Sequence, residues 1–479
     1  MLKTRKSILA LIIALFVIAS FGIASADEQI DGMMTNNGVA LPLDVPAFAG
    51  GLTANLDNYL NPGGLGDTLL YNYFNARKSM QTFFTVVNTS NTAGQRVRLR
   101  FREAADVLPN GVCTTEEPRG SFEVLDFDIC LSHNDMWSGY VTFDSVTGGA
   151  MLCTLDTDTF VYDGTNGANV FPSTCVPFKF GAANGQALGN ITADDTLEGY
   201  FEIIGERELI PEPLSCWPDS STHSNSPDLV GTDVPNVLFG NAALVDSSTG
   251  AMYTYDATAI ADFAATDIFS SPTTSTPTLK NAGDSILGVN YILTREHLFS
   301  VYDLSGASAT EFIVTEPTKA LTQICGTDND IFDDDRAQFT IWDDKENSVT
   351  TLCAFSPCTT SDNHLPFEVN IIALNASAAV DSTVAQQLVT GYTFGWFDIN
   401  LNAASSPLSP LHEIVVTDQS TPAITTTTMG WPVLGLTLLD VNNGMTTGTF
   451  KMQSSTDIFS TPARTIPQGS DDPDGDGPR

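Results

Sequence analysis

Two neighbouring segments decide the fold: QTFFTVVN (Gln81–Asn88) and QRVRLRFRE (Gln95–Glu103), joined by the polar bend TSNTAG (Thr89–Gly94). The second segment alternates apolar residues with four arginines, which are Arg96, Arg98, Arg100 and Arg102. In an extended strand a period of two places all four guanidinium groups on one face and the apolar residues on the other. The pattern therefore predicts a strand, a turn and a second, half-buried strand.

A third segment, SFEVLDFDICLS (Ser121–Ser132), carries Asp126 and Asp128 on the face opposite its apolar residues. Neighbouring strands of one sheet would place these carboxylates opposite the arginines, and each such pair stabilises a sheet by roughly 0.2–1 kcal/mol. We favour a structural cross-strand network for the arginine row. The alternative is a docking face for an anionic partner.

The rest of the chain consists of short aromatic and β-branched segments separated by Gly, Asn, Asp and Pro clusters. This spacing is typical of β-sandwiches and not of alternating strand and helix units. We predict an all-β protein with two or more antiparallel β-sandwich, immunoglobulin-like domains and long disulfide-stapled loops. ATAIADF (Ala257–Phe263) is the one segment for which we predict a short helix.

Composition shifts suggest the domain organisation. We expect a signal peptide at 1–26, an N-terminal β-sandwich region at 27–210, a Pro/Ser-rich boundary loop at 211–228, a C-terminal β-sandwich region at 229–453 and an acidic, disordered tail at 454–479. The boundary loop concentrates Pro, Ser and Asp, which favour turns and irregular structure. A long surface loop is the other interpretation of this segment.

The first 26 residues have the three parts of an export signal. Lys3, Arg5 and Lys6 precede an apolar run, and Ala24-Ser25-Ala26 is a small-residue cleavage site. An uncleaved membrane anchor is the alternative, because the apolar run approaches the length of a bilayer span. We expect export to the periplasm, the cell surface or the extracellular space, with no integral membrane span after cleavage.

The chain is strongly acidic, with 57 Asp+Glu, 20 Lys+Arg and a formal net charge of −37. Cleavage of the signal would remove three of the cations and none of the acids. Such a charge repels nucleic acid and anionic lipid and attracts divalent cations or basic partners. Because 42% of the residues are hydrophobic, the chain can nevertheless bury substantial cores.

All eight cysteines lie after the signal, and an even number in an exported chain indicates disulfides. Sequence proximity favours Cys113–Cys130 and Cys153–Cys175. The remaining cysteines leave the connectivity open, and a buried free thiol is the alternative for any one of them.

Acidic residues crowd one loop, GTDNDIFDDDR (Gly326–Arg336). Calcium takes six to eight oxygen ligands from closely spaced carboxylates and carbonyls. The loop is therefore a calcium-binding candidate, and no other cofactor is expected. A solvated acidic loop that maintains solubility is the alternative. The candidate ligands are Asp328, Asp330, Asp333, Asp334 and Asp335.

No sequence motif indicates a particular enzymatic reaction. The five histidines are scattered, and the chain has no HExxH, G-x-S-x-G, P-loop or strand-associated GxGxxG motif. The five tryptophans could form a sugar-stacking platform, but all except Trp217 lie in strand patterns, for which we expect core packing.

Several segments, in order along the chain, resemble a group of exported or cell-surface proteins of Gram-negative bacteria that have no assigned activity. They include GDTLLYNYF (Gly66–Phe74), VRLRFREA (Val97–Ala104), EGYFEII (Glu198–Ile204), FIVTEPTK (Phe312–Lys319) and PFEVNII (Pro366–Ile372). The resemblance implies an exported, β-rich protein and carries no catalytic residues.

We therefore expect a non-enzymatic structural, adhesive or binding protein that is stabilised by calcium and either assembles with itself or contacts a glycan or protein on a surface. A glycan-binding module is one alternative and requires a row of exposed aromatic side chains on one sheet face. A secreted polysaccharide hydrolase is the other and requires a concave pocket with two carboxylates or a Ser-His pair.

Overall fold

The computed structural model describes residues 59–104, 123–154, 175–180, 191–209, 234–263, 293–317, 337–351, 365–375, 381–401 and 431–442, with single-residue gaps at 249, 262, 307, 366 and 389, together with residue 156 and short strands at 160–170 and after 413. All of them belong to one compact unit, Asp44–Arg479. Apart from the single 3₁₀ turn η2 (Asp195–Leu197), the elements of this described part are strands. The nearly all-β architecture with several antiparallel sheets agrees with the sequence pattern.

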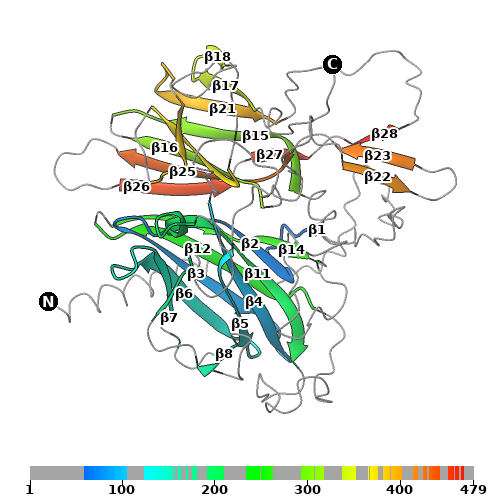
Figure 1. The fold of residues 1–479 in the computed structure, drawn as a ribbon. Coiled ribbons are helices and arrows are strands. Elements are labelled where there is room, and N and C mark those ends of the chain that lie inside the picture. Colours follow the sequence, from blue (N-terminus) through cyan, green and yellow to red (C-terminus); the bar gives the residue numbers. More distant parts are fainter. Residues whose placement is uncertain are drawn as a thin grey trace. The chain divides into compact units, whose positions relative to one another are not determined.

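Two sheets form the first layer pair (Figure 1). Sheet 1 has the order β1 (Tyr59–Leu60), β14 (Thr258–Ala261), β2 (Thr68–Asn75), β11 (Glu198–Leu209), β4 (Gly94–Glu103), β5 (Glu123–Leu131), β8 (Phe160–Tyr162) and β9 (Asn169–Val170). Sheet 2 has the order β10 (Cys175–Pro177), β7 (Ala150–Thr154), β6 (Met136–Phe143), β3 (Met80–Asn88), β12 (Leu238–Asp246) and β13 (Ala251–Asp256).

An aromatic core fills the space between sheets 1 and 2. Phe201 stacks on Tyr71, with 4.1 Å between ring centroids, and on Phe101, with 4.8 Å. Phe84 and the fully buried Trp137 complete the cluster from sheet 2. The apolar residues of β4, which are Val97, Leu99 and Phe101, belong to this core, as the alternation with the four arginines predicts.

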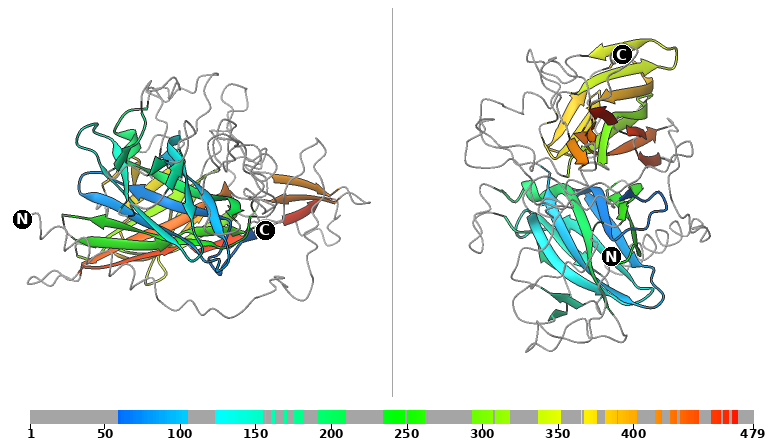
Figure 2. Two further views of the ribbon diagram at one scale, coloured as in Figure 1. Left: turned by 90° about the horizontal axis from the view of Figure 1, so that it is seen from below. Right: turned by 90° about the vertical axis from the view of Figure 1, so that its right-hand side faces the viewer.

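Two further sheets form the second layer pair, which Figure 2 shows from two other directions. Sheet 3 has the order β18 (Ser348–Thr351), β17 (Gln338–Asp343), β21 (Phe394–Asn400), β15 (Thr294–Asp303) and β24 (Trp431–Pro432), and β27 (Phe459–Pro462) also pairs with β15. Sheet 4 has the order β20 (Ala385–Leu388), β19 (Val369–Leu374), β16 (Ala309–Thr315), β25 (Leu434–Asn442) and β26 (Lys451–Asp457). A small sheet 5 contains β22 (Ile414–Asp418), β23 (Ile424–Thr428) and β28 (Thr465–Gln468).

Sheet 4 is buried on both faces. Every residue of β16 and β19 is buried. Phe312 and Val314 belong to the core shared with sheet 3, whereas Ile313 belongs to the same hydrophobic cluster as the core of sheets 1 and 2. Because sheet 4 contributes to two cores, β16 and β19 are buried on both faces and do not show the alternation of buried and exposed residues of a one-sided sheet.

Three expectations require correction. The segment predicted as a helix contains strand β14, in which Thr258 pairs with Leu70 and Ile260 with Thr68. Tertiary pairing overrides the helix propensity of alanine here, since Ala259 and Ala261 are small enough to lie buried in the sheet.

The expected domain bounds also differ from the structure. The first layer pair continues beyond the boundary expected at 211–228, because β12, β13 and β14 belong to sheets 1 and 2. Strands also continue to Gln468, within the region expected to be a disordered tail from 454.

No helical segment in the described part of the chain has the length and hydropathy of a transmembrane span. The segments expected to be a signal peptide (1–26) and a boundary loop (211–228) lie outside the described residues.

Candidate functional site

The arginine row lies on β4, the central strand of a charged ladder in sheet 1. Arg98 Nη1 lies 2.7 Å from Asp128 Oδ1 of β5, and Arg96 Nε lies 2.9 Å from Glu206 Oε2 of β11. The remaining ion pairs are Arg96–Asp128, Arg98–Asp126, Arg100–Glu123, Arg100–Glu202 and Arg102–Glu202. Carboxylates of both flanking strands therefore surround the four guanidinium groups.

These arginines are also largely removed from solvent. Arg96, Arg100 and Arg102 are only 3–6% exposed. Their guanidinium groups are engaged within the sheet, and the geometry supports a structural role for the row over an open face for an anionic partner.

Five carboxylates form ion pairs with the four arginines in the described part of this ladder. Burial, and next the charge of Asp128, raise the pKa of Glu206 to about 7, although Arg96, Arg98 and Arg100 oppose the shift. Glu206 can therefore change its protonation state near neutral pH.

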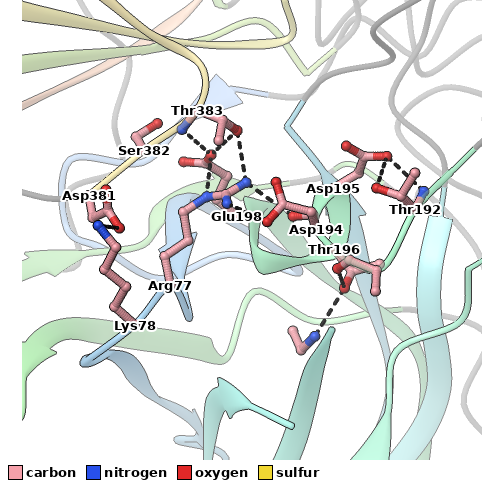
Figure 3. A network of polar contacts seen from close by, with 12 residues as sticks. Arg77, Lys78, Thr192, Asp194, Asp195, Thr196, Glu198, Asp381, Ser382 and Thr383 are labelled. Carbon is pink, nitrogen blue, oxygen red and sulfur yellow. Dashed lines mark hydrogen bonds and ion pairs between the residues drawn. The ribbon is translucent and has the colours of Figure 1, made fainter. Parts of the chain in front are cut away.

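A second polar network surrounds the buried carboxylate of Glu198 at the start of β11 (Figure 3). Its Oε1 accepts hydrogen bonds from Arg77 Nε at 2.8 Å and from the backbone N–H and hydroxyl of Thr383, both at 2.9 Å. Its Oε2 accepts one from the Tyr73 hydroxyl at 2.9 Å. Arg77 also binds Asp194 and the Thr383 hydroxyl. Residues from both layer pairs thus satisfy this carboxylate completely.

A third network also joins the two layer pairs. The Tyr200 hydroxyl of β11 donates to Glu368 Oε2 at 2.9 Å, and the backbone N–H of Val369 donates to the carbonyl of Ala104 at 3.2 Å. These buried contacts, like those of Glu198, fix the second layer pair on the first.

The structure joins Cys153 of β7 to Cys175 of β10, which are directly opposed in the sheet. Cys130 is also disulfide-bonded. Cys113 lies outside the described residues, so its expected pairing with Cys130 stays a prediction.

The calcium candidates Asp328, Asp330, Asp333, Asp334 and Asp335 also lie outside the described residues. Among the side chains that the structure does describe, no group of three or more His, Cys, Asp or Glu residues is arranged to hold a metal ion.

The outer face of sheet 3 presents a cluster of solvent-exposed aromatic side chains. Trp396, Phe394 and Val301 are 39%, 50% and 52% exposed, and Trp342 and Phe299 are partly exposed. We call the surface formed by Phe299, Val301, Trp342, Phe394 and Trp396 the aromatic face. It spans the three adjacent strands β17, β21 and β15.

Strand register orders this face into rows. Trp342, Trp396 and Val301 are opposed across the three strands, and the next row contains Thr340, Asp398 and Phe299. The third row contains Gln338, Asn400 and His297. Aromatic rings at one end therefore give way to hydroxyl, carboxylate, amide and imidazole groups at the other.

Trp342 and Trp396 stack almost in parallel, with 3.9 Å between ring centroids and 5° between ring planes. The backbone below them makes this close approach feasible. An ideal Cβ on Gly395 would lie 1.9 Å from the Trp342 carbonyl oxygen, so any side chain there would push β17 away from β21. Gly395 is thus the residue that allows the two tryptophans to meet.

Asp398 lies in the centre of the second row and pairs with His297 Nδ1 at 3.0 Å. Burial raises the pKa of this carboxyl group, and the hydrogen bond with His297 opposes the shift. The face consequently combines flat apolar rings with a positioned carboxylate, which is the combination found in sites for small polar ligands.

The sequence pattern assigned four tryptophans to cores; this is correct for Trp137, whereas Trp342 is partly exposed and Trp396 is exposed. Trp217 lies outside the described residues, and of Trp431 only the backbone is described. A signal for the exposed pair was present in the sequence. Trp396 shares its strand phase with Asp398 and Asn400, and Trp342 shares its phase with Thr340 and Gln338, whereas the opposite phases contain the buried residues Phe397 and Ile399 and Phe339 and Ile341.

The comparisons with known proteins give no further assignment, because no protein-family model, no curated protein and no solved structure matches the chain.

Proposed function

We propose that this protein is an exported, non-enzymatic carbohydrate-binding protein that contacts glycan chains through the aromatic face. The observation that carries the proposal is the exposure of Trp342, Trp396 and Phe394 together on one sheet face. A glycan-binding module requires such a face, because the apolar faces of sugar rings stack on aromatic side chains.

The polar rows support the same proposal. Sugars offer many hydroxyl groups, and a binding surface must replace the hydrogen bonds that these groups lose from water. Thr340, Asp398 and Gln338 lie within one or two rows of the paired tryptophans. They supply donors and acceptors beside the apolar rings.

We further propose that the two layer pairs are immunoglobulin-like β-sandwich domains and that the chain acts in the periplasm, at the cell surface or outside the cell. The shared cores of sheets 1 and 2 and of sheets 3 and 4 support the domain description. The apparent signal peptide and the resemblance to exported proteins of Gram-negative bacteria support the location.

The test is a glycan array and co-sedimentation with insoluble polysaccharides, using the mature protein with disulfides intact. We expect binding to at least one polysaccharide and a loss of tenfold or more in affinity for the double variant Trp342→Ala/Trp396→Ala, which corresponds to about 1.4 kcal/mol. The matched control is Tyr140→Ala, which removes a partly exposed ring stacked on Phe83 in sheet 2. An array without binding, or a double variant that binds like the parent, would disprove the proposal.

A further inference from the structure

We propose that the aromatic face selects glycan chains that carry free amino groups, such as polymers of unsubstituted amino sugars, over neutral or acidic chains. This inference rests on the proposed carbohydrate-binding function and specifies its ligand class. Three features of the face support it: a pair of partly exposed indole rings, carboxylates near these rings and the alignment of its residues along one strand.

The first feature is the outer surface of the Trp342 ring. One side of this indole is covered by Trp396, because the two rings stack in parallel across β17 and β21. The other side is turned toward the edge strand β18, where the opposed residue is the small, exposed Ser348. The partly exposed Trp342 ring can therefore contact a ligand on the side away from Trp396. An ammonium group in that position is attracted by the ring quadrupole, most strongly for tryptophan.

The second feature is the charge around the rings. The turn after β17, at the Trp342 end of the face, carries Asp344 and Glu346 beside the cation Lys345. Asp398 lies one row away from Trp396. Together with a net charge of −37 for the whole chain, these carboxylates attract an ammonium-bearing chain and repel uronate, sulfate or phosphate groups.

Asp398 has the position that an amine-binding carboxylate needs. It is opposed to Thr340 on one side and to Phe299 on the other, and it is only partly buried. Its carboxylate contacts the His297 ring, and because a carboxylate can accept several hydrogen bonds, Asp398 can also take a second donor. An ammonium group is a donor that such a carboxylate binds strongly.

The third feature is alignment. Phe394, Trp396, Asp398 and Asn400 alternate along β21 on the same face of the sheet. With a rise of about 3.4 Å per residue, these positions extend over roughly 20 Å. A surface of this shape suits an extended, unbranched chain and gives successive sugar units a ring contact followed by polar contacts.

The experiment compares two oligosaccharides of equal length by isothermal titration calorimetry. One is a glucosamine oligomer with free amino groups, studied at a mildly acidic pH that protonates them, and the other is its fully N-acetylated form. We expect at least tenfold tighter binding of the free amine, with an affinity that falls as the NaCl concentration rises. Equal or tighter binding of the acetylated oligomer would overturn the inference but leave the carbohydrate-binding function intact. If neither oligomer binds and the array is also empty, the proposed function itself fails.

Variants locate the selectivity. Asp398→Asn should reduce the preference for the free amine over the acetylated oligomer to threefold or less. Asp256→Asn is the matched control, because Asp256 is a strand carboxyl group in sheet 2 whose pKa is likewise raised by burial. An Asp398→Asn variant that folds normally and keeps the full preference for the free amine would contradict the assigned role of Asp398.

Discussion

The hydroxyl group of Tyr302 donates a hydrogen bond to the backbone carbonyl of Trp342, 2.9 Å away and two strands distant. Tyr302 is opposed to Gly395 on the intervening strand β21, and the absence of a side chain at Gly395 leaves room for the tyrosine to reach β17. A related contact occurs in the first layer pair, where Tyr71 of sheet 1 donates to the Thr85 carbonyl of sheet 2 at 2.5 Å, beside Gly240. In each pair a buried tyrosine thus donates to a strand carbonyl next to a glycine.

Gly395→Ala should destabilise the protein and separate the two tryptophans. The added Cβ would overlap the Trp342 carbonyl, so β17 must move and the Tyr302 bond must lengthen. We expect a loss of about 2–4 kcal/mol in the free energy of unfolding, as for other overpacked or strained sites. Chemical denaturation of the variant and the parent measures this loss. Gly391→Ala is the control, since a Cβ there would meet nothing within 4 Å; equal stability of the two variants would contradict the prediction.

Tyr302→Phe should cost about 1–2 kcal/mol of unfolding free energy, because it leaves the Trp342 carbonyl without this donor while the ring remains in the core. Burial also raises the pKa of the Tyr302 hydroxyl to about 12, so the bond should persist through the neutral and mildly alkaline range. Thermal unfolding of the variant and the parent between pH 7 and 9 checks both statements. A stability difference that disappears on moving to pH 9 would show that the hydroxyl ionises earlier than expected.

Glu206→Gln should change how stability depends on pH. The folded pKa of about 7 lies above the ordinary carboxyl value of 4.5, so between these values the folded protein binds more protons than the unfolded chain. The stabilising contribution of Glu206 to the free energy of unfolding is therefore full below pH 4.5 and is lost as the pH rises toward 7. Relative to the parent, the variant should gain about 1–3 kcal/mol between pH 5 and pH 8, measured by urea denaturation. Glu346→Gln, an exposed control, should show no such trend.

Arg77→Met should be strongly destabilising, because it leaves the buried Glu198 carboxylate without its cation. Removal of one partner of a buried ion pair typically costs about 3–5 kcal/mol, whereas replacing both partners by apolar residues costs much less. The double variant Arg77→Met/Glu198→Leu should thus recover part of the lost stability in a double-mutant cycle. Lys78→Met removes the neighbouring exposed ion pair with Asp381 and should change stability by less than about 1 kcal/mol. A double-mutant cycle with no coupling energy between Arg77 and Glu198 would contradict a stabilising role for this ion pair.

Calcium should raise the melting temperature of the mature protein if the acidic loop binds it. A ligand that binds only the folded state adds RT ln(1 + [L]/Kd) to the unfolding free energy. Unfolding scans in millimolar calcium and in chelator, with light scattering in parallel, measure this effect and any assembly. The variant Asp330→Asn/Asp334→Asn should abolish the difference. Identical unfolding scans of the parent in calcium and in chelator would contradict calcium binding by the folded protein.

The sequence predicted the parts of the fold that depend on local alternation. The arginine strand and the Asp126–Asp128 strand are neighbours in the register that their periodicity suggests, with Arg98 opposed to Asp128 and Arg100 to Asp126. The Glu198 network could not be predicted, because Arg77 and Thr383 lie 121 and 185 residues from Glu198 and no local pattern links them. The aromatic face was assigned to a core because Trp396 and Phe397 are both apolar, and only their polar neighbours distinguish the outward phase from the inward one.

The double burial of sheet 4 has a consequence for how the chain can be divided. A recombinant fragment starting near Leu293, intended to isolate the aromatic face, would bring to its surface Ile313, Ile371 and Leu436, which lie in one cluster with the core of sheets 1 and 2. A contiguous apolar surface of that kind promotes aggregation. The two halves are therefore not interchangeable modules, and a soluble fragment would need polar substitutions on sheet 4 before its ligand binding could be studied alone.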